Sequence, residues 1–224
     1  MTNRIEALTR ALPLTPPAGC VRLAHTADNH LRLSAGGSTD RGADFKDAFL
    51  DVVTKSHERG CHTLISAGDL VDRVELSARV AQDLLAVLKR AEDLGLRTFT
   101  VQGNHDMAAT NPWPKVLGSH LSRVTALDGL TVDFSPVAGL PPMRITGWSF
   151  CNPDSMRQQL SGLRLAKSSD VLIWHGPVAE LANFQGDHVN LADFEDLGTA
   201  AVLLGDIHKT AYVEVKGSGV LGYP

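Results

Sequence analysis

The first half of the chain alternates between two patterns of hydrophobic and polar positions. Short apolar runs at 21–24, 62–67 and 97–102 are typical of buried strands. Between these runs, over 44–60 and 76–95, apolar residues recur at helical spacing and each segment ends at a glycine. The order strand, helix, strand, helix, strand predicts right-handed crossovers and a parallel sheet.

After about residue 120 the apolar runs become shorter, and Gly and Pro turns separate most of them. A helix is expected near 155–160. The strands are expected at 130–134, 143–150, 171–174, 200–204, 212–215 and 220–223. Together the halves predict an α/β fold, a two-sheet β-sandwich flanked by helices in four layers (αββα).

Length and composition indicate one ordinary globular domain. The chain has 224 residues, of which 43% are hydrophobic and 21% charged, so one α/β domain can bury a sizeable core. Residues 1–20 contain three prolines, Pro13, Pro16 and Pro17, and are expected to form an N-terminal extension. The domain itself is expected to span 21–224.

Several classes of protein are disfavoured by simple counts. No apolar stretch approaches the roughly 20 residues that span a bilayer, and no signal pattern opens the chain, so we expect a cytoplasmic protein without a membrane partner. Three separated cysteines, Cys20, Cys61 and Cys151, support neither a disulfide framework nor a cysteine metal cage. The formal net charge of −4 argues against a basic surface along the whole chain, so any DNA contact needs local charge, metal ions or a partner.

Five apolar runs end in polar clusters that can bind metal ions. Ligands of open α/β sheets gather beyond the carboxyl ends of strands, so these five endings are expected to converge. Because residues i and i+2 of an extended segment point the same way, each Asp-x-His pair can face one site. The clusters are TADNH at 26–30, GDLVD at 68–72, GNHD at 103–106, WHG at 174–176 and GDIH at 205–208.

The donor set consists of carboxylate, amide and imidazole groups without thiolate. Such a set suits Mn²⁺, Fe or Zn²⁺ in an open catalytic site better than a structural zinc. Roughly seven ligands are too many for one tetrahedral ion and enough for two ions, which would activate water for phosphoester hydrolysis. Each cluster alone has a simpler interpretation: a turn, a helix cap at Asp72, or a core histidine at His175.

The ordered motifs DNH, GDLVD, GNHD, HG and GDIH resemble the calcineurin-like metallophosphoesterase superfamily over residues 28–208. Within it, HTADNHL followed by a helix and AGDLVD is most similar to the SbcD and meiotic-recombination (MRE) type of DNA-repair nuclease. The resemblance implies two divalent ions, with Mn²⁺ expected and Fe or Zn²⁺ as alternatives. The metal ligands that it implies are Asp28, His30 and His208 on one ion, Asn104, His175 and Asp206 on the other, and Asp69 between them.

The resemblance also implies two catalytic residues and several partners. His105 is expected to act as general acid or transition-state hydrogen-bond donor, oriented by Asp106. DNA is the expected substrate of an exonuclease or endonuclease, and an SbcC-type ATPase subunit and a second copy of the chain are the expected partners. The DNA-capping domain of the family is expected to be absent from this chain, which stops at Pro224.

One motif leaves an alternative function open. GDLVDR, with Arg73, also resembles a motif of protein serine/threonine phosphatases, so a phosphatase or small-molecule phosphodiesterase is the alternative function.

The family motif has histidine where this chain has Asp206, which adds a negative charge to the site. We expect Asp206 to hold its metal more tightly and to move the activity maximum to more alkaline pH than histidine would.

Overall fold

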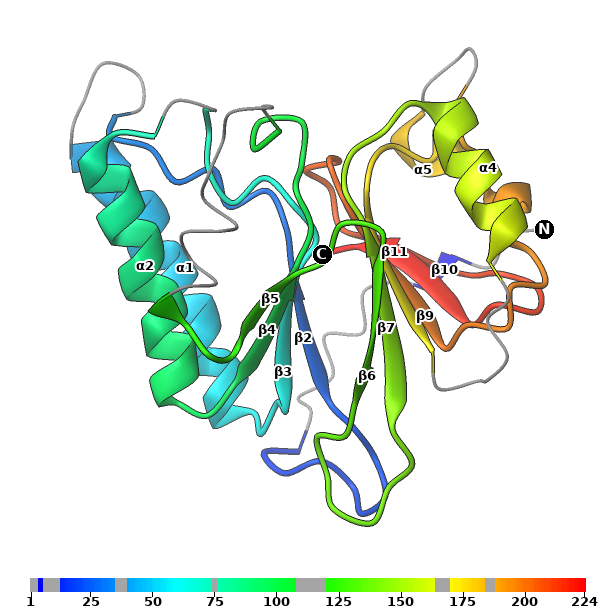
Figure 1. Ribbon diagram of the computed structural model, residues 1–224, viewed down its shortest axis with the longest axis horizontal. Coiled ribbons are helices and arrows are strands. Elements are labelled where there is room, and N and C mark those ends of the chain that lie inside the picture. The colour runs from blue at the N-terminus through cyan, green and yellow to red at the C-terminus, as the bar shows by residue number, and fades with distance from the viewer. Residues whose placement is uncertain are drawn as a thin grey trace.

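The computed structural model describes residues 4–5, 13–34, 40–73, 76–107, 120–163, 170–183 and 188–224. Its strands form two sheets that face each other (Figure 1). The smaller sheet has four parallel strands in the order β2 (Leu23–Thr26), β3 (Thr63–Ser66), β4 (Arg97–Thr100) and β5 (Val124–Ala126). The predicted parallel sheet is therefore confirmed.

The larger sheet is mixed. Its order is β1 (Arg4–Ile5), β10 (Ala211–Glu214), β11 (Val220–Tyr223), β9 (Ala201–Gly205), β8 (Val171–His175), β7 (Met143–Trp148) and β6 (Leu130–Phe134). Strands β7, β8, β9 and β11 run parallel, and the outer strands pair antiparallel. Strand β1 lies within the expected N-terminal extension, so two residues of that segment pair with the sheet.

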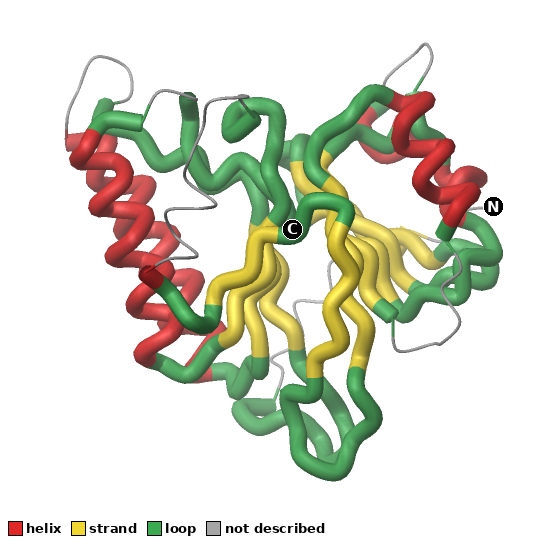
Figure 2. Tube along the Cα trace, in the orientation of Figure 1, coloured by secondary structure: helices red, strands yellow, loops and turns green. Residues whose placement is uncertain are grey.

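Helices cover the outer faces of both sheets (Figures 1 and 2). Helices α1 (Asp40–Glu58) and α2 (Ala78–Asp93) lie on the smaller sheet, and α4 (Pro153–Gly162), α5 (Ala179–Ala182) and the 3₁₀ helix η1 (Leu191–Phe194) lie on the larger one. Local sequence explains where they begin, since the side chains of Ser77 and Asn152 accept hydrogen bonds from the first turns of α2 and α4.

The central strands β3 and β8 are buried on both faces, and the core has three apolar layers. In β3, Leu64 packs with the helices and Ile65 packs between the sheets. In β8, Trp174 packs under the outer helices and Ile173 faces the smaller sheet. The predicted four-layer αββα fold is confirmed. None of the described helices is long and apolar enough to cross a membrane.

Candidate metal centre

The side chains predicted to bind metal lie on loops at one end of both sheets. β2, β3 and β4 run into the loops of Asp28, Asp69 and Asn104, while β8 ends at His175 and β9 leads into Asp206. The sheets touch here, because Nδ1 of His175 on the larger sheet lies 2.7 Å from the carbonyl oxygen of Ala67, just after β3. The convergence expected from the strand ends is therefore present.

The backbone of these loops is in the left-handed region, which residues other than glycine rarely adopt. Asp28, His30, Asp69 and Asp206 have φ values of 55°, 45°, 51° and 102°. Left-handed backbone at a residue other than glycine costs on the order of 1–3 kcal/mol and clusters at functional sites. The described parts of the chain contain six non-glycine residues with positive φ, and four of them are candidate ligands. The backbone strain is therefore concentrated at the candidate site.

One group of ligand atoms comes from Asp28, His30 and His208, whose atoms lie within 4.8 Å of one another. The Nε2 atoms of His30 and His208 face each other at 3.2 Å, and Nε2 of His208 lies 3.7 Å from Oδ1 of Asp28. The backbone N–H of Asp206 donates to both carboxylate oxygens of Asp28, at 3.1 and 3.2 Å. A shared cation would satisfy both facing imidazole lone pairs at once.

A second group surrounds Nε2 of His175, which is fully buried. This atom lies 3.1 Å from Oδ1 of Asn104, 3.6 Å from Oδ2 of Asp69 and 3.8 Å from Oδ1 of Asp206. Because the Nδ1–H of His175 donates to a backbone carbonyl, the lone pair of Nε2 points toward these oxygens. A neutral His175 in this orientation can bind a cation through Nε2.

Asp69 lies between the two groups. Its Oδ2 is 3.7 Å from Nε2 of His30 and 3.6 Å from Nε2 of His175. Its other oxygen accepts a hydrogen bond from the backbone N–H of His105, at 2.9 Å. Gly103 makes this approach possible, since a Cβ there would collide with Oδ1 of Asp69. All seven predicted ligands are thus adjacent, and their metal roles stay predictions.

Burial perturbs the acids and imidazoles in the direction that favours a bound cation. Burial raises the pKa of Asp28 to about 7 and that of Asp69 to about 6, and it also raises the pKa of Asp206. Burial lowers the pKa of His30 and His175 to about 4, so both are neutral at pH 7. Buried carboxylates beside neutral imidazoles, without thiolate, fit two divalent ions.

Protons and metal ions should compete for Asp28 and Asp69. Because the folded protein binds these protons more tightly than the unfolded chain, the stability of the metal-free protein should fall as pH rises from about 4 to 7. We expect saturating Mn²⁺ to raise the melting temperature by several degrees at pH 7.5 and much less at pH 5.5. Calorimetric scans with and without EDTA measure this, and a metal effect equal at both pH values would contradict it.

His105 lies at the open side of the centre with its ring held by a backbone carbonyl. Nδ1 of His105 is 2.9 Å from the carbonyl oxygen of Asp72, and its ring centroid is 4.8 Å from that of His30. Its side chain is exposed, whereas His30 beside it is buried. An imidazole at this position can reach a substrate that approaches from solvent.

The expectation that Asp106 orients His105 needs correction. Asp106 is fully buried, and its carboxylate accepts hydrogen bonds from the backbone N–H groups of Leu70, Val71 and Gly103. The ring of His105 is instead held by the backbone carbonyl of Asp72. Asp106 therefore ties the loops after β3 and β4 together, and a motif alone could not reveal which neighbour holds the histidine.

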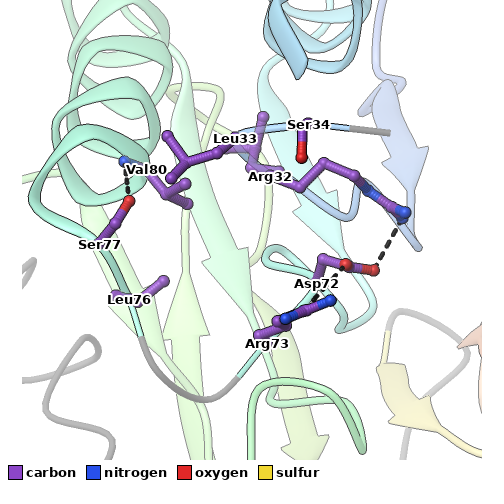
Figure 3. Close-up of a pocket in the computed structure, with 9 residues that line it drawn as sticks. Arg32, Leu33, Ser34, Asp72, Arg73, Leu76, Ser77 and Val80 are labelled. Atoms are coloured by element: carbon purple, nitrogen blue, oxygen red, sulfur yellow. Dashed lines mark hydrogen bonds and ion pairs between the residues drawn. The ribbon is translucent and has the colours of Figure 1, made fainter. Parts of the chain in front are cut away.

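Asp72 is the site residue that the sequence did not assign. Its Oδ1 lies 3.6 Å from Nδ1 of His30, an atom that is buried without a hydrogen-bond partner, and 2.8 Å from Nη2 of Arg32. Figure 3 shows Arg32 and Arg73 on either side of Asp72, at the wall of a cavity of about 250 Å³. The second aspartate of GDLVD is the available signal, although the local sequence favours a helix cap there.

Sequence comparisons show which known proteins this chain is similar to. Over 204 residues the chain is 25% identical to the DNA double-strand break repair protein Mre11 of Methanosarcina acetivorans, and over 207 residues it is 28% identical to Mre11 of Haloferax volcanii. These alignments cover 87% and 89% of this chain, but only 32% and 44% of the relatives, so the chain spans less than half of their length.

A structure comparison shows the shared fold, and a family model shows the family. The crystal structure of TT1561 of Thermus thermophilus superposes with a TM-score of 0.64 at 14% identity, covering 92% of this chain and 89% of the other, which shows a shared fold. The family model described as calcineurin-like phosphoesterase matches residues 21–210. Since that match takes in every candidate ligand from Asp28 to His208, this chain belongs to the calcineurin-like phosphoesterase family.

Proposed function

We propose that this protein is a metal-dependent phosphodiesterase that cleaves DNA, of the SbcD type. The observation that carries the proposal is the convergence of seven ligand side chains and His105, from five strand ends, at one end of the sandwich. Such a site suits hydrolysis of a phosphoester by two-metal chemistry. Mn²⁺ is the metal that we expect, with Fe or Zn²⁺ as alternatives.

Each residue then has a defined task. Asp28, His30 and His208 would hold one ion, Asn104, His175 and Asp206 the other, and Asp69 would contact both. When bound, two divalent ions supply a water of lowered pKa and positive charge for the phosphoryl oxygens.

The protein's own groups position the reaction. The imidazole of His105, held through Nδ1 by the carbonyl of Asp72, would present Nε2 to the scissile phosphate and deliver a proton to the leaving oxygen. The carboxylate of Asp72, which lies between His30 and Arg32, would attract the Nδ1–H of His30 and so favour the ring orientation in which Nε2 faces its ligand group.

Two observations support DNA as the substrate. The relatives over most of this chain are named as DNA double-strand break repair proteins. Arg32 and Arg73 also place positive charge beside the centre of a chain whose net charge is −4. An SbcC-type ATPase subunit and a homodimer belong to the same proposal, as does a DNA-capping domain outside this chain.

A phosphatase or small-molecule phosphodiesterase is the second candidate. The observation that favours it is the side chain of Arg73, which is 86% exposed next to Asp72 and free to meet a single phosphate group. The net charge of −4 points the same way, because a small substrate needs no extended basic surface.

One set of assays separates the two candidates. The protein with Mn²⁺ is tested on single- and double-stranded DNA and on nitrophenyl phosphate monoesters and diesters. Cleavage of DNA that disappears in His105→Ala supports the nuclease. Robust monoesterase activity with DNA left intact would assign the phosphatase instead.

Asp206 gives a further expected result. Its Oδ1 lies 3.8 Å from Nε2 of His175, so replacing it with histidine removes one negative charge from the second ligand group. We expect Asp206→His to weaken Mn²⁺ binding by about tenfold or more and to move the activity maximum to lower pH. Asp206→Asn removes the charge but keeps an oxygen donor. Titration calorimetry and matched pH–rate profiles measure both effects, and unchanged profiles would contradict the assignment.

A further inference from the structure

We propose a second binding site, for a phosphorylated small molecule of about mononucleotide size, at the opposite end of the smaller sheet from the candidate metal centre. The site is a groove of about 440 Å³, which we call the arginine groove. Its lining residues come from the amino ends of β3, β4 and β5 and from the end of β6, and the β6–β7 hairpin is at the bottom of Figure 1. The residues that matter are His62, Leu94, Arg97, Arg123, Phe134 and Ser135.

The groove is separate from the metal centre because it lies at the other ends of the same strands. His62 precedes β3, Arg97 is the first residue of β4, and Arg123 precedes β5. The candidate metal ligands follow the carboxyl ends of β2, β3 and β4. A four-residue strand is about 13 Å long, so no single small ligand contacts both sites.

Arg97 is fixed in place but has unused hydrogen-bond donors. Its Nη2 donates to Oγ1 of Thr125 at 3.0 Å, and its guanidinium carbon lies 5.6 Å from the ring centroid of Phe99. Its Nε is buried and has no hydrogen-bond partner. A buried donor without a partner is rare in folded proteins and indicates a missing ligand or water.

Arg123 and His62 add further donors. One guanidinium nitrogen of Arg123 donates to the carbonyl oxygen of Gly95 at 3.0 Å, and the side chain is otherwise exposed. Nδ1 of His62 accepts a hydrogen bond from the backbone N–H of Arg22 at 3.0 Å. Because Nδ1 is the acceptor, the ring proton is on Nε2, which is therefore a hydrogen-bond donor.

The charge balance of the groove favours an anion. Among the described residues, neither Arg97 nor Arg123 makes an ion pair, and the groove lining contains no aspartate or glutamate. Arginine presents a planar fork of donors that matches phosphate oxygens. Arg144 on the neighbouring hairpin is, by contrast, paired with Asp133. Two arginines without acidic partners in one groove of a chain of net charge −4 indicate a negatively charged ligand.

Size and apolar walls narrow the ligand. A volume of 440 Å³ lies within the roughly 300–1,000 Å³ of small-molecule sites, and it exceeds what one phosphate ion needs. Leu94 and Phe134 provide apolar surface beside the arginines. A phosphate group would contact the arginines, and an organic group attached to it would contact these apolar side chains. This assignment does not depend on the proposed DNA cleavage.

Titration calorimetry with deoxyadenosine 5′-monophosphate tests the site, using the full chain loaded with Mn²⁺. We expect saturable binding that Arg97→Gln/Arg123→Gln weakens at least tenfold. Arg144→Gln, which changes an arginine already paired on the neighbouring hairpin, should bind as the wild type does. Asp69→Asn, which alters the metal centre, should retain this binding and so separates it from any binding at the ions.

The outcomes are distinct. Arg123→Gln alone changes only an exposed side chain and is expected to lower the affinity, which keeps the test valid if the double variant unfolds. Undetectable binding to the wild type, or equal binding to the double variant, would overturn the proposal. Binding of a short single-stranded oligonucleotide that the double variant loses, without binding of the mononucleotide, would overturn it in favour of a nucleic-acid contact.

Discussion

Replacing His105 with alanine is expected to lower kcat for phosphodiester cleavage by about 10²–10⁴-fold, the usual contribution of a positioned general acid. The reason is geometric: the ring is exposed, it is held at Nδ1 by the carbonyl of Asp72, and it is not one of the seven predicted ligands, although a ring nitrogen lies within 4.8 Å of ligand atoms of His30 and Asp72. The substitution leaves the hydrogen bond from the backbone N–H of residue 105 to Asp69 in place.

Metal binding should therefore survive the loss of the ring. Mn²⁺ affinity from calorimetry is expected to stay within a few-fold of the wild type while steady-state kinetics report the lost turnover. His57→Ala, at an exposed position in the last turn of α1, is the matched control and should be fully active. A His105→Ala protein that keeps most of its activity, or loses its metal, would refute the role given to this residue.

Asp69→Asn is expected to have the largest effect on the metal centre. Among the described residues, the Oδ2 atom of Asp69 lies within 4 Å of both His30 and His175, so it is the natural link between two ions. Loss of residues that merely support ligands lowers metal affinity by about 10–100-fold, so loss of this ligand should lower it by at least about 100-fold. Activity should fall with it.

The same substitution should leave the metal-free protein intact. Burial raises the pKa of Asp69 to about 6, so its ionised form destabilises the folded state above that pH. Asparagine avoids this charge and can still accept the hydrogen bond from His105. We expect metal-free Asp69→Asn to melt no lower than metal-free wild type at pH 8 and to gain nothing from Mn²⁺. A marked drop in the metal-free melting temperature would show that Asp69 has a structural role instead.

Long periodic segments made the fold predictable from the sequence. The helical spacing before Gly60 and Gly95 and the apolar runs of β6, β8 and β11 are local signals that tertiary packing reinforces. The missed elements were β1, β5, α5 and η1, which have two to four residues each. Segments this short carry too little periodicity to be recognised, and only their neighbours in space specify them.

The candidate site could be predicted only in part for a similar reason. Residue type and strand ends indicated that Asp28, His175 and His208 would meet, because parallel strands bring their carboxyl ends together. The left-handed backbone of Asp206 and the carbonyl of Asp72 beside His105 depend on contacts between loops distant in sequence. Those details have no local signature.

The contact between the two sheets at Ala67 and His175 has a consequence for how the molecule comes apart. Four of the seven predicted ligands belong to loops of the smaller sheet and three to the larger one, so bound ions would connect the two sheets. Opening of the sandwich at this end would then require release of the ions, and chelation would loosen both sheets together. Amide hydrogen exchange in β3 and β8 should slow in concert when Mn²⁺ is added.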